Sequence, residues 1–261
     1  MQNIQKWNEA AFDFQKAFQT GLSDYSKGLL LFMMDNGMLR SGCRVIDVGC
    51  GVGKYGTYFA AMGCDVTLTD ISYGMLEMAK KNMSSFSTPW TTLECDFGEV
   101  DPVHPVFAGG FDLGISTMCP AIHDLETVRK FSDMVHGWCF ITHFTGWEEP
   151  LRNVFYEKLG VRPEEDMTRF NRYVDGLTEA IRAAGFEPHM REVPYSWCDM
   201  RTPEDAARYL LTRLGDVEIT DGLREKALIA ARELCDENGV FADAVHTTVA
   251  WVWWNTKENK L

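Results

Sequence analysis

The chain reads Arg44-Val45-Ile46-Asp47-Val48-Gly49-Cys50-Gly51-Val52-Gly53 near its start, a short apolar run that leads directly into three alternating glycines. Such a run is typical of a parallel strand buried on both faces of a sheet. Glycine lacks a Cβ atom, so Gly49, Gly51 and Gly53 can adopt positive φ and let the backbone approach a ligand. Since a helix is predicted directly afterwards, from Tyr55 to Met62, the loop lies at a helix N-terminus and predicts a site for a nucleotide-containing cofactor.

Two classes of cofactor fit a glycine-rich loop of this kind. A nicotinamide or flavin site needs Gly-x-Gly-x-x-Gly, and residues 51–56 match that pattern formally. In such a site the first glycine closes the strand, but here Gly49 already does so. An ionised Asp47 would repel an anionic pyrophosphate and attract an ammonium group. These residues therefore favour a cofactor with an amino acid moiety over a dinucleotide.

The stretch from Arg44 to Asp124 resembles the class I S-adenosylmethionine-dependent methyltransferases, whose first motif is an acidic residue followed by Gly-x-Gly-x-Gly. A second strand is predicted at residues 65–70, and its last residue, Asp70, can accept both ribose hydroxyls of a bound cofactor. Residues 70–79 resemble the Asp-x-Ser-x-x-Met-Leu-x-x-Ala segment of members that act on small molecules. The resemblance implies S-adenosyl-L-methionine as the cofactor and S-adenosyl-L-homocysteine as its product, with an acceptor that the residues leave unidentified.

Two further motifs follow in the order of that family. A third strand ends in Leu93-Glu94-Cys95-Asp96-Phe97, where the resemblance implies that Asp96 accepts the adenine amino group while the N–H of Phe97 reaches the ring. A fourth strand is predicted at residues 111–117, and the family carries its methyl-transfer region at the end of this strand. The cofactor-binding residues predicted in this way are Asp47, Gly49, Cys50, Gly51, Gly53, Asp70, Ile71, Met75, Asp96, Phe97 and Ser116. Singly, each also has a structural interpretation, since a glycine can end a strand, Asp70 can cap a helix and Asp96 can form a turn.

The first 40 residues predict two helices. Apolar residues recur at steps of three and four, which places them on one stripe of an amphipathic helix that packs against the domain; they are Ile4, Trp7, Ala11, Phe14 and Phe18. A second helix is predicted to begin at Ser23 or Asp24 and to end near Asn36-Gly37. In the family that the chain resembles, helices before the first strand often cover the cofactor and the substrate.

The remaining elements predict an α/β fold of the Rossmann-like, doubly wound kind, with a mostly parallel sheet of seven strands and an antiparallel last strand. Helices are expected at 125–134, 149–159, 165–184, 202 onward and 223–234, and strands at 138–143, 187–195 and 244–254. We expect a single class I methyltransferase domain over residues 1–261, with an N-terminal helical cover at 1–40 and a cofactor-binding core at 41–195. The resemblance implies that the last strand inserts beside strand six and that a helical insertion at 196–240 forms a lid over the substrate.

Composition limits the partners of the chain. The 25 Lys and Arg face 38 Asp and Glu, and a net charge of −13 repels a phosphate backbone, so no nucleic acid partner is expected. Residues 116–120 also lack the Asn/Asp-Pro-Pro-Tyr/Phe motif of enzymes that methylate nucleobase or glutamine amides. The eight cysteines show no metal-ligand spacing, so we expect no metal site and a reducing cytoplasm. No signal peptide or membrane-spanning run is expected, and the protein is predicted to be a monomer or a homodimer.

Transfer of an activated methyl group depends more on aligning the acceptor with the bond between sulfur and the methyl carbon than on a general base. Where a base helps, His123 and His143 are the candidates, because both follow predicted strands at the ligand edge. The substrate pocket is predicted to use the residues Trp7, Phe18, Tyr25, Thr117, Met118, Cys119 and Trp147. Three functions stay open at this point: a methyltransferase acting on a small metabolite, a nicotinamide-dependent oxidoreductase, and a partner protein that binds the cofactor without catalysis.

Overall fold

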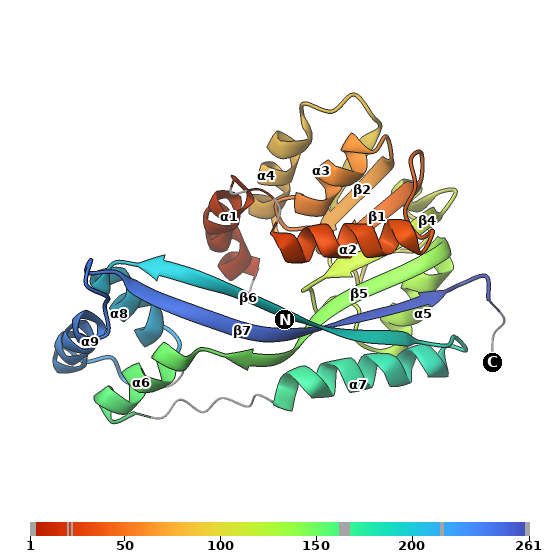
Figure 1. Cartoon of the computed structure of the whole chain (residues 1–261). Coiled ribbons are helices and arrows are strands. Elements are labelled where there is room, and N and C mark those ends of the chain that lie inside the picture. Colours follow the sequence, from red (N-terminus) through yellow and green to blue (C-terminus); the bar gives the residue numbers. More distant parts are fainter. Residues whose placement is uncertain (1–3, 20, 22, 162–167, 215–216, 259–261) are drawn as a thin grey trace. The chain divides into compact units, whose positions relative to one another are not determined.

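The structure is a computed structural model of the chain that describes residues 4–19, 21, 23–161, 168–214 and 217–258 (Figure 1). These residues form two compact units. The first comprises residues 1–143, 173–191 and 250–261, and the second comprises residues 144–172 and 192–249. The sequence predicted a helical insertion at 196–240 within one domain. The second unit is larger than that insertion. It also includes residues 144–172, which follow the first departure of the chain from the first unit, and it extends over 192–249 after the second departure.

In the described part of the chain, seven strands form one mixed sheet in the order β3-β2-β1-β4-β5-β7-β6. Their bounds are β1 Arg44–Val48, β2 Asp65–Asp70, β3 Trp90–Glu94, β4 Phe111–Thr117, β5 Val135–Glu148, β6 His189–Arg201 and β7 Phe241–Asn255. The first five strands of this order are parallel, with Val45 opposite both Val66 on β2 and Leu113 on β4. Antiparallel strands end the sheet, with β7 between β5 and β6, as the sequence predicted.

Helices alternate with the strands. Their bounds are α1 Ile4–Gln19, α2 Asp24–Asp35, α3 Lys54–Ala61, α4 Tyr73–Met83, α5 Leu125–Met134, α6 Pro150–Leu159, α7 Thr168–Ala183, α8 Pro203–Leu211 and α9 Asp221–Glu233, with a short 3₁₀ helix at Pro105–Phe107. Several start where a polar residue caps the first turn. The Ser23 side chain accepts a hydrogen bond from the N–H of Ser26, and Asp124 forms a capping box with Thr127. The predicted bounds of β2, β4 and α5 are confirmed without a shift.

The core of the first unit packs against the neighbouring strands β1 and β4. Ile46, Ile141 and Phe131 are fully buried, and Trp254 of β7 joins the same cluster. Gly114 of β4 is required there, because a Cβ atom would lie 2.6 Å from the ring of Phe131. The indole N–H of Trp254 donates to the hydroxyl of Ser132 over 3.0 Å, so the buried polar atom is satisfied.

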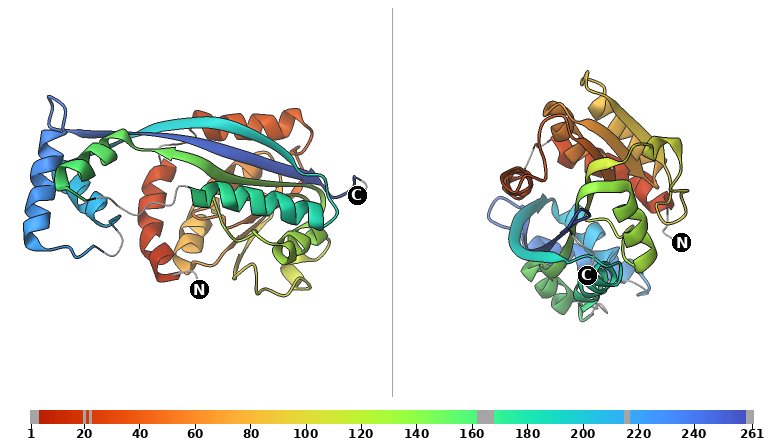
Figure 2. Two further views of the ribbon diagram at one scale, coloured as in Figure 1. Left: turned by 90° about the horizontal axis from the view of Figure 1, so that it is seen from below. Right: turned by 90° about the vertical axis from the view of Figure 1, so that its right-hand side faces the viewer.

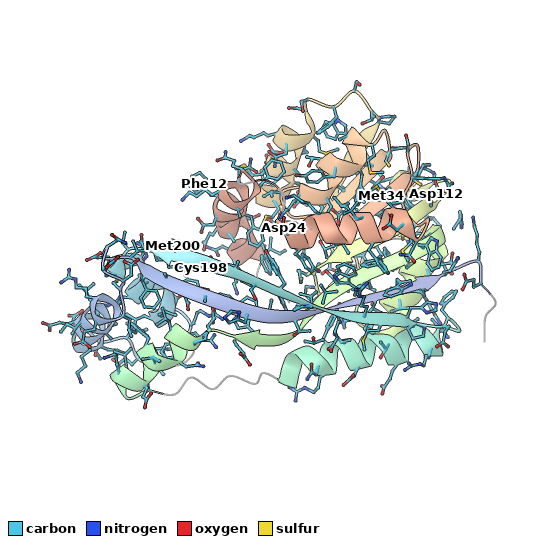
Figure 3. All side chains as sticks on the ribbon, in the orientation of Figure 1. Phe12, Asp24, Met34, Asp112, Cys198 and Met200 are labelled. Atoms are coloured by element: carbon cyan, nitrogen blue, oxygen red, sulfur yellow. The ribbon has the colours of Figure 1, made fainter. Side chains whose placement is uncertain are left out.

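Helix α1 packs along a narrower stripe than the sequence predicted. Ala11 is buried and packs in a cluster with Val52 and Met75, but Ile4 and Phe14 of the expected stripe are 44% and 47% exposed. The prediction was wrong for those two residues. Figure 2 shows α1 beside α4, and Phe12, labelled in Figure 3, lies on the outer side of α1 at 62% exposure.

Side-chain amides complete the contact between α1 and the rest of the first unit. The Oδ1 atom of Asn8 accepts from the hydroxyl of Ser72 over 2.7 Å and from the N–H of Gly74 over 2.9 Å. Gln15 and Asn82 exchange two hydrogen bonds of 2.8 Å, and Asn82 also donates to the carbonyl of Val52. These hydrogen bonds attach α1 to the first unit through polar side chains. The spacing of apolar residues does not reveal such contacts, and it therefore predicted more buried residues on α1 than the structure has.

The last three strands are longer than predicted. Strand β5 ends at Glu148 instead of His143, β6 ends at Arg201 instead of Tyr195, and β7 begins at Phe241 instead of Ala244. Charged residues in these extensions weaken the apolar pattern that marks a strand. On β6 the burial nevertheless alternates, so that Cys198 and Met200 are exposed, as Figure 3 shows, while their neighbours Trp197 and Asp199 are half-buried.

The second unit has an apolar cluster of its own. Phe155 and Tyr156 of α6 pack with Leu210 of α8, Ala227 of α9 and Phe241 of β7. The hydroxyl of Tyr156 donates to the carbonyl of Leu210 over 2.8 Å, which ties α6 to α8. Helix α6 therefore packs with the helices that the sequence assigned to an insertion, which explains why the unit begins at residue 144.

No helix among the described residues is long and apolar enough to cross a membrane.

Candidate functional site

The carboxyl ends of β1, β2 and β4 meet at one edge of the sheet, and the glycine loop after β1 curls over that edge. The N–H groups of Gly49 and Cys50 both donate to the carbonyl of Thr69 on β2, over 2.8 and 3.0 Å. Gly49, Gly51 and Gly53 have φ of 73°, 54° and 77°, all in the left-handed region. Glycine is favoured at each of these positions because side chains strain this backbone conformation.

The three glycines have different surroundings. A Cβ atom on Gly49 would clash with Cys119, whose own Cβ would lie 2.7 Å away. A Cβ atom on Gly53 would lie 3.1 Å from that of Ala79, so this glycine lets α3 and α4 approach. On Gly51 the nearest described atom would be the sulfur of Met75 at 3.9 Å. Of the three glycines, Gly51 thus has the most room beside it, with a single ordinary contact, and is the one best placed to contact a ligand.

Asp47 lies beneath this loop, at the end of β1. Its side chain is buried, and neither carboxylate oxygen accepts a hydrogen bond from any residue that the structure describes. Burial, with a smaller contribution from the negative charge of Asp70, raises the pKa of Asp47 to about 8. A buried carboxyl group without a partner is unusual in a folded protein, and it is a candidate to receive a donor from a ligand.

Asp70 organises the opposite side of the loop. One carboxylate oxygen accepts from the N–H of Gly51 over 2.8 Å, and the other accepts from the N–H of Ser72 over 2.9 Å. Burial raises the pKa of Asp70, and these two hydrogen bonds oppose the rise. Since each carboxylate oxygen has more than one lone pair, both can accept a further hydrogen bond from a diol. Ile71 is half-buried and Met75 is buried, so both predicted residues lie at this loop.

The end of β3 reaches the same edge, because the N–H of Cys95 donates to the carbonyl of Asp70 over 3.0 Å. Asp96 is exposed, and its Oδ1 atom accepts from the N–H of Gly98 over 2.9 Å. The ring of Phe97 packs in the core against Phe131, with ring centres 6.0 Å apart. Only the main chain of Phe97 is thus available for the predicted contact with an adenine ring.

Lys130 was missed by the sequence analysis. It lies on α5, and its ammonium group donates to the carbonyls of Phe97 and Val100 over 3.1 Å each, and to that of Gly98. Three carbonyls on one ammonium hold the loop after β3 in place. The sequence carried no signal for this contact, because a lysine that binds main-chain carbonyls looks like any other surface lysine.

The residues after β4 have an unusual backbone. Met118 has φ of 53°, which is uncommon for a residue with a side chain, and its N–H donates to the carbonyl of Thr142 over 2.9 Å. Such strain is frequent at functional sites. The hydroxyl of Ser116 donates to the carbonyl of Val48 over 2.9 Å, so this predicted cofactor residue uses its side chain to join β4 to β1. Thr117 is half-buried at the same strand end.

Cys119 and Cys50 bring two thiols to the site. Burial raises the pKa of Cys119 to about 12 and that of Cys50 well above its usual range, and the nearby carboxylates of Asp47 and Asp70 raise both further. Both groups are therefore neutral thiols at physiological pH, and a role as a thiolate nucleophile is disfavoured.

The two histidines proposed as bases lie in different surroundings. The ring of His143 stacks on that of Tyr173, with centres 3.9 Å apart, and the hydroxyl of Tyr173 donates to the carbonyl of Ile122 over 2.7 Å. His143 therefore lies beside the loop that follows β4. The side chain of His123 is 55% exposed, with its Nε2 atom 3.7 Å from Asp124. Tyr173 was also missed, because one tyrosine within a helix pattern gives no sign that it anchors a distant loop.

The aromatic pocket candidates separate into three groups. Trp7 and Phe18 pack in the cluster of α1 with Val52 and Met75, next to the glycine loop. Tyr25 accepts a hydrogen bond from the indole N–H of Trp251 over 2.9 Å, so it packs against β7. Trp147 belongs to the second unit, where it contacts Trp197. Among the described residues, no group of His, Cys, Asp and Glu is arranged to hold a metal ion.

Comparison with known proteins agrees with this geometry. Residues 45–138 match the family described as "Methyltransferase domain". The ribosomal protein L11 methyltransferase of Thermotoga neapolitana is 32% identical over 122 residues, which are 46% of this chain, and the chain spans 42% of the length of that relative.

Two solved structures show the same fold. A candidate methyltransferase from Bacillus halodurans is 14% identical, covers 87% of this chain and 98% of its own, and has a TM-score of 0.50. A candidate sarcosine dimethylglycine methyltransferase from Galdieria sulphuraria is 13% identical, covers 88% of this chain and 84% of its own, and also has a TM-score of 0.50. The predicted resemblance is thus confirmed for residues 45–138, which match a methyltransferase domain.

Proposed function

We propose that the chain is an enzyme that transfers the methyl group of S-adenosyl-L-methionine to a small-molecule acceptor and releases S-adenosyl-L-homocysteine. The observation that carries the proposal is Asp47, a buried carboxyl group beneath the glycine loop that accepts no hydrogen bond from any residue that the structure describes. A ligand with an ammonium group supplies the missing donor. The small-molecule class is supported by the net charge of −13, which disfavours a polyanionic acceptor.

The residues of the site fit this cofactor in four places. Asp47 receives the ammonium group, Asp70 accepts the ribose hydroxyls, and the main chain at Gly51 follows the ligand between them. Asp96 and the N–H of Phe97 bind the adenine ring. A dinucleotide fits less well, because its pyrophosphate would approach the carboxylate of Asp70 and would bring no donor to Asp47.

When bound, the cofactor supplies a methyl group already activated by its sulfonium charge. The chain then has to orient the acceptor, exclude water and remove a proton where the acceptor carries one. His143 is the better of the two proposed bases, because Tyr173 fixes its ring beside the loop after β4 while His123 is exposed. That loop begins at Met118, whose φ of 53° is uncommon for a residue with a side chain and is a kind of strain frequent at functional sites.

The same proposal includes the location and the partners of the protein. The described cysteines form no disulfides, which suits a reducing cytoplasm. We propose a monomer or a homodimer without nucleic acid or membrane partners.

Asp47 gives the site a dependence on pH. Because its pKa of about 8 lies above neutrality, the carboxyl group is mostly protonated at pH 7 in the free protein, and binding of an ammonium group requires its ionised form. Binding at pH 7 is therefore expected to release about one proton, and affinity is expected to rise between pH 6 and about 8. Calorimetry in buffers of different ionisation enthalpy measures that proton.

Asp47→Asn is the matched variant for this measurement, because it keeps the shape of the side chain and cannot titrate. We expect weaker binding without the released proton. The sign of the stability effect follows from the raised pKa: the ionised form is destabilising in the folded protein, so the cost grows from about pH 4 to about pH 8. The variant should therefore raise the melting temperature more at pH 8.5 than at pH 5, and an equal rise at both would contradict the assignment.

The function itself is tested by calorimetric titration with S-adenosyl-L-methionine, S-adenosyl-L-homocysteine and NADH in parallel. Micromolar binding of the first two ligands, with no binding of NADH, supports the proposal. Binding of NADH alone would favour a nicotinamide-dependent oxidoreductase instead. A protein that binds the first two is then incubated with pools of small metabolites, and release of S-adenosyl-L-homocysteine is followed. Binding without turnover in any pool would favour a partner protein that binds the cofactor without catalysis.

A further inference from the structure

The second unit contains a buried carboxylate that the methyl-transfer site does not use. Asp243 lies on β7 and has no exposed surface, and neither of its oxygens accepts a hydrogen bond from a described residue. Burial and the charge of Glu149 raise the pKa of Asp243 to about 6, so the group is still mostly ionised at neutral pH. A buried negative charge without a donor is costly, and a ligand that supplies a donor would remove that cost.

The cations near Asp243 already have other partners. Arg152 lies 2.5 Å from Glu149, which is also 3.1 Å from Arg213. Arg201 lies 2.9 Å from Asp199, and its guanidinium stacks over the ring of Tyr209 at 4.0 Å. Arg152 and Arg201 lower the pKa of Asp243 by their charge, but neither comes within ion-pair distance of it in the described structure.

Aromatic rings lie on the same face of the sheet as Asp243. A hydrogen bond of 3.0 Å between the side chains of Ser196 and His246 indicates that these residues lie close together on the neighbouring strands β6 and β7. An antiparallel pairing with these two residues opposite each other places residue 199 opposite Asp243 and residue 197 opposite residue 245. Burial alternates on both strands, so Trp197 and Asp243 share the inner face as diagonal neighbours.

Three more rings extend this surface. The ring of Trp147 is 5.2 Å from that of Trp197, and Phe144 and Tyr195 each contact one of these two indoles. The indole N–H of Trp147 is buried and has no hydrogen-bond acceptor among the described residues. The inner face of these strands therefore presents ring faces, one carboxylate and one N–H donor, the last two without a hydrogen-bond partner among the described residues.

We propose that Asp243, Trp147 and Trp197 form a binding site for a small molecule that carries a protonated amine with a hydrogen-bond acceptor close to it. The carboxylate receives the ammonium group, the indole rings stabilise the cation through their faces, and the N–H of Trp147 donates to the acceptor atom. A neutral ligand leaves the charge of Asp243 without a partner, and an anionic ligand is repelled by it.

The inference does not depend on the proposed function, since every residue of this binding site belongs to the second unit.

The test uses the full chain without cofactor and two probes, 2-aminoethanol and 2-amino-1-phenylethanol, with ethylene glycol and 1-phenylethane-1,2-diol as their uncharged counterparts. We expect an amine to bind at millimolar concentration or below and to change the tryptophan fluorescence, while its uncharged counterpart does not. Asp243→Asn should weaken that binding at least tenfold. Asp205→Asn, which removes an exposed carboxylate of α8 in the same unit, is the control and should bind as the parent does.

Loss of folding is a small risk, because Asp243→Asn removes a buried charge that lacks a partner. The variant is expected to melt at or above the temperature of the parent at pH 8. Failure of both amines to bind, or equal binding by Asp243→Asn, would overturn the site. Since the probes are tested without cofactor, that failure is distinct from failure of the proposed function, which would appear as absent binding of S-adenosyl-L-homocysteine.

Discussion

Gly51→Val is expected to abolish cofactor binding while the protein still folds. The structure leaves space for a first side-chain atom at this position, since the nearest described atom is the sulfur of Met75 at 3.9 Å. That same space is where we place the ligand, so the valine would occupy it. We expect the affinity for S-adenosyl-L-homocysteine, measured by calorimetry, to fall by more than a hundredfold.

The valine also has to adopt a left-handed conformation, which costs roughly 1–2 kcal/mol in any fold. Gly42→Val is the matched control, because Gly42 has φ of 79°, no atom within 4 Å of a Cβ, and a position before β1 away from the loop. Both variants should lose similar stability in thermal melting. Unchanged affinity in a folded Gly51→Val protein, or an equal loss of affinity in Gly42→Val, would overturn the assignment of the loop.

Asp70→Ala is expected to produce the second largest loss. The ribose contacts alone are worth about 1–3 kcal/mol as charged hydrogen bonds, which is roughly a 10- to 100-fold loss of affinity. The structure adds a second effect, because Asp70 also holds the N–H groups of Gly51 and Ser72. Without the carboxylate, the main chain at Gly51 and Ser72 loses two hydrogen bonds that hold its conformation. The measured loss of affinity should therefore lie at the upper end of that range.

Asp70→Asn separates the two effects. Its one amide oxygen can still accept from the main chain, so it should bind more tightly than Asp70→Ala and less tightly than the parent. Asp65→Ala serves as the control, since Asp65 lies at the opposite end of β2 and pairs with Arg44 at 3.3 Å. Calorimetric affinities within twofold of the parent for Asp70→Ala would place the ribose elsewhere.

Much of the first unit could be predicted because its signals are local. The apolar run of β1, the serine and aspartate caps of α2 and α5, and the turn before β4 each lie within a few residues of the element they define. The long strands β5, β6 and β7 were harder, because Asp199 and Asp243 interrupt the apolar pattern. Asp199 pairs with Arg201 two residues further along the same strand, and Asp243 is a buried carboxylate without a hydrogen-bond partner among the described residues. An apolar alternation along the sequence predicts neither of these situations.

The same division holds for the site. The glycine loop, Asp47 and Asp70 form one continuous motif, and the structure brings them to one edge of the sheet. Lys130 and Tyr173 act through main-chain carbonyls of distant loops, so their residue type carries no sign of the contact. The sequence also could not predict that Asp47 accepts no hydrogen bond from a described residue, because this depends on which donor groups the fold places around its carboxyl group.

The exposure of Cys198 on β6 has a practical consequence. Cys50 and Cys139 are buried, and burial raises the pKa of both thiols well above the usual range, so both are slow to react with alkylating reagents. A maleimide dye at neutral pH should therefore modify Cys198 first. The natural sequence thus offers a labelling position on the second unit, through which energy transfer from its tryptophans can follow an incoming ligand without any engineered cysteine.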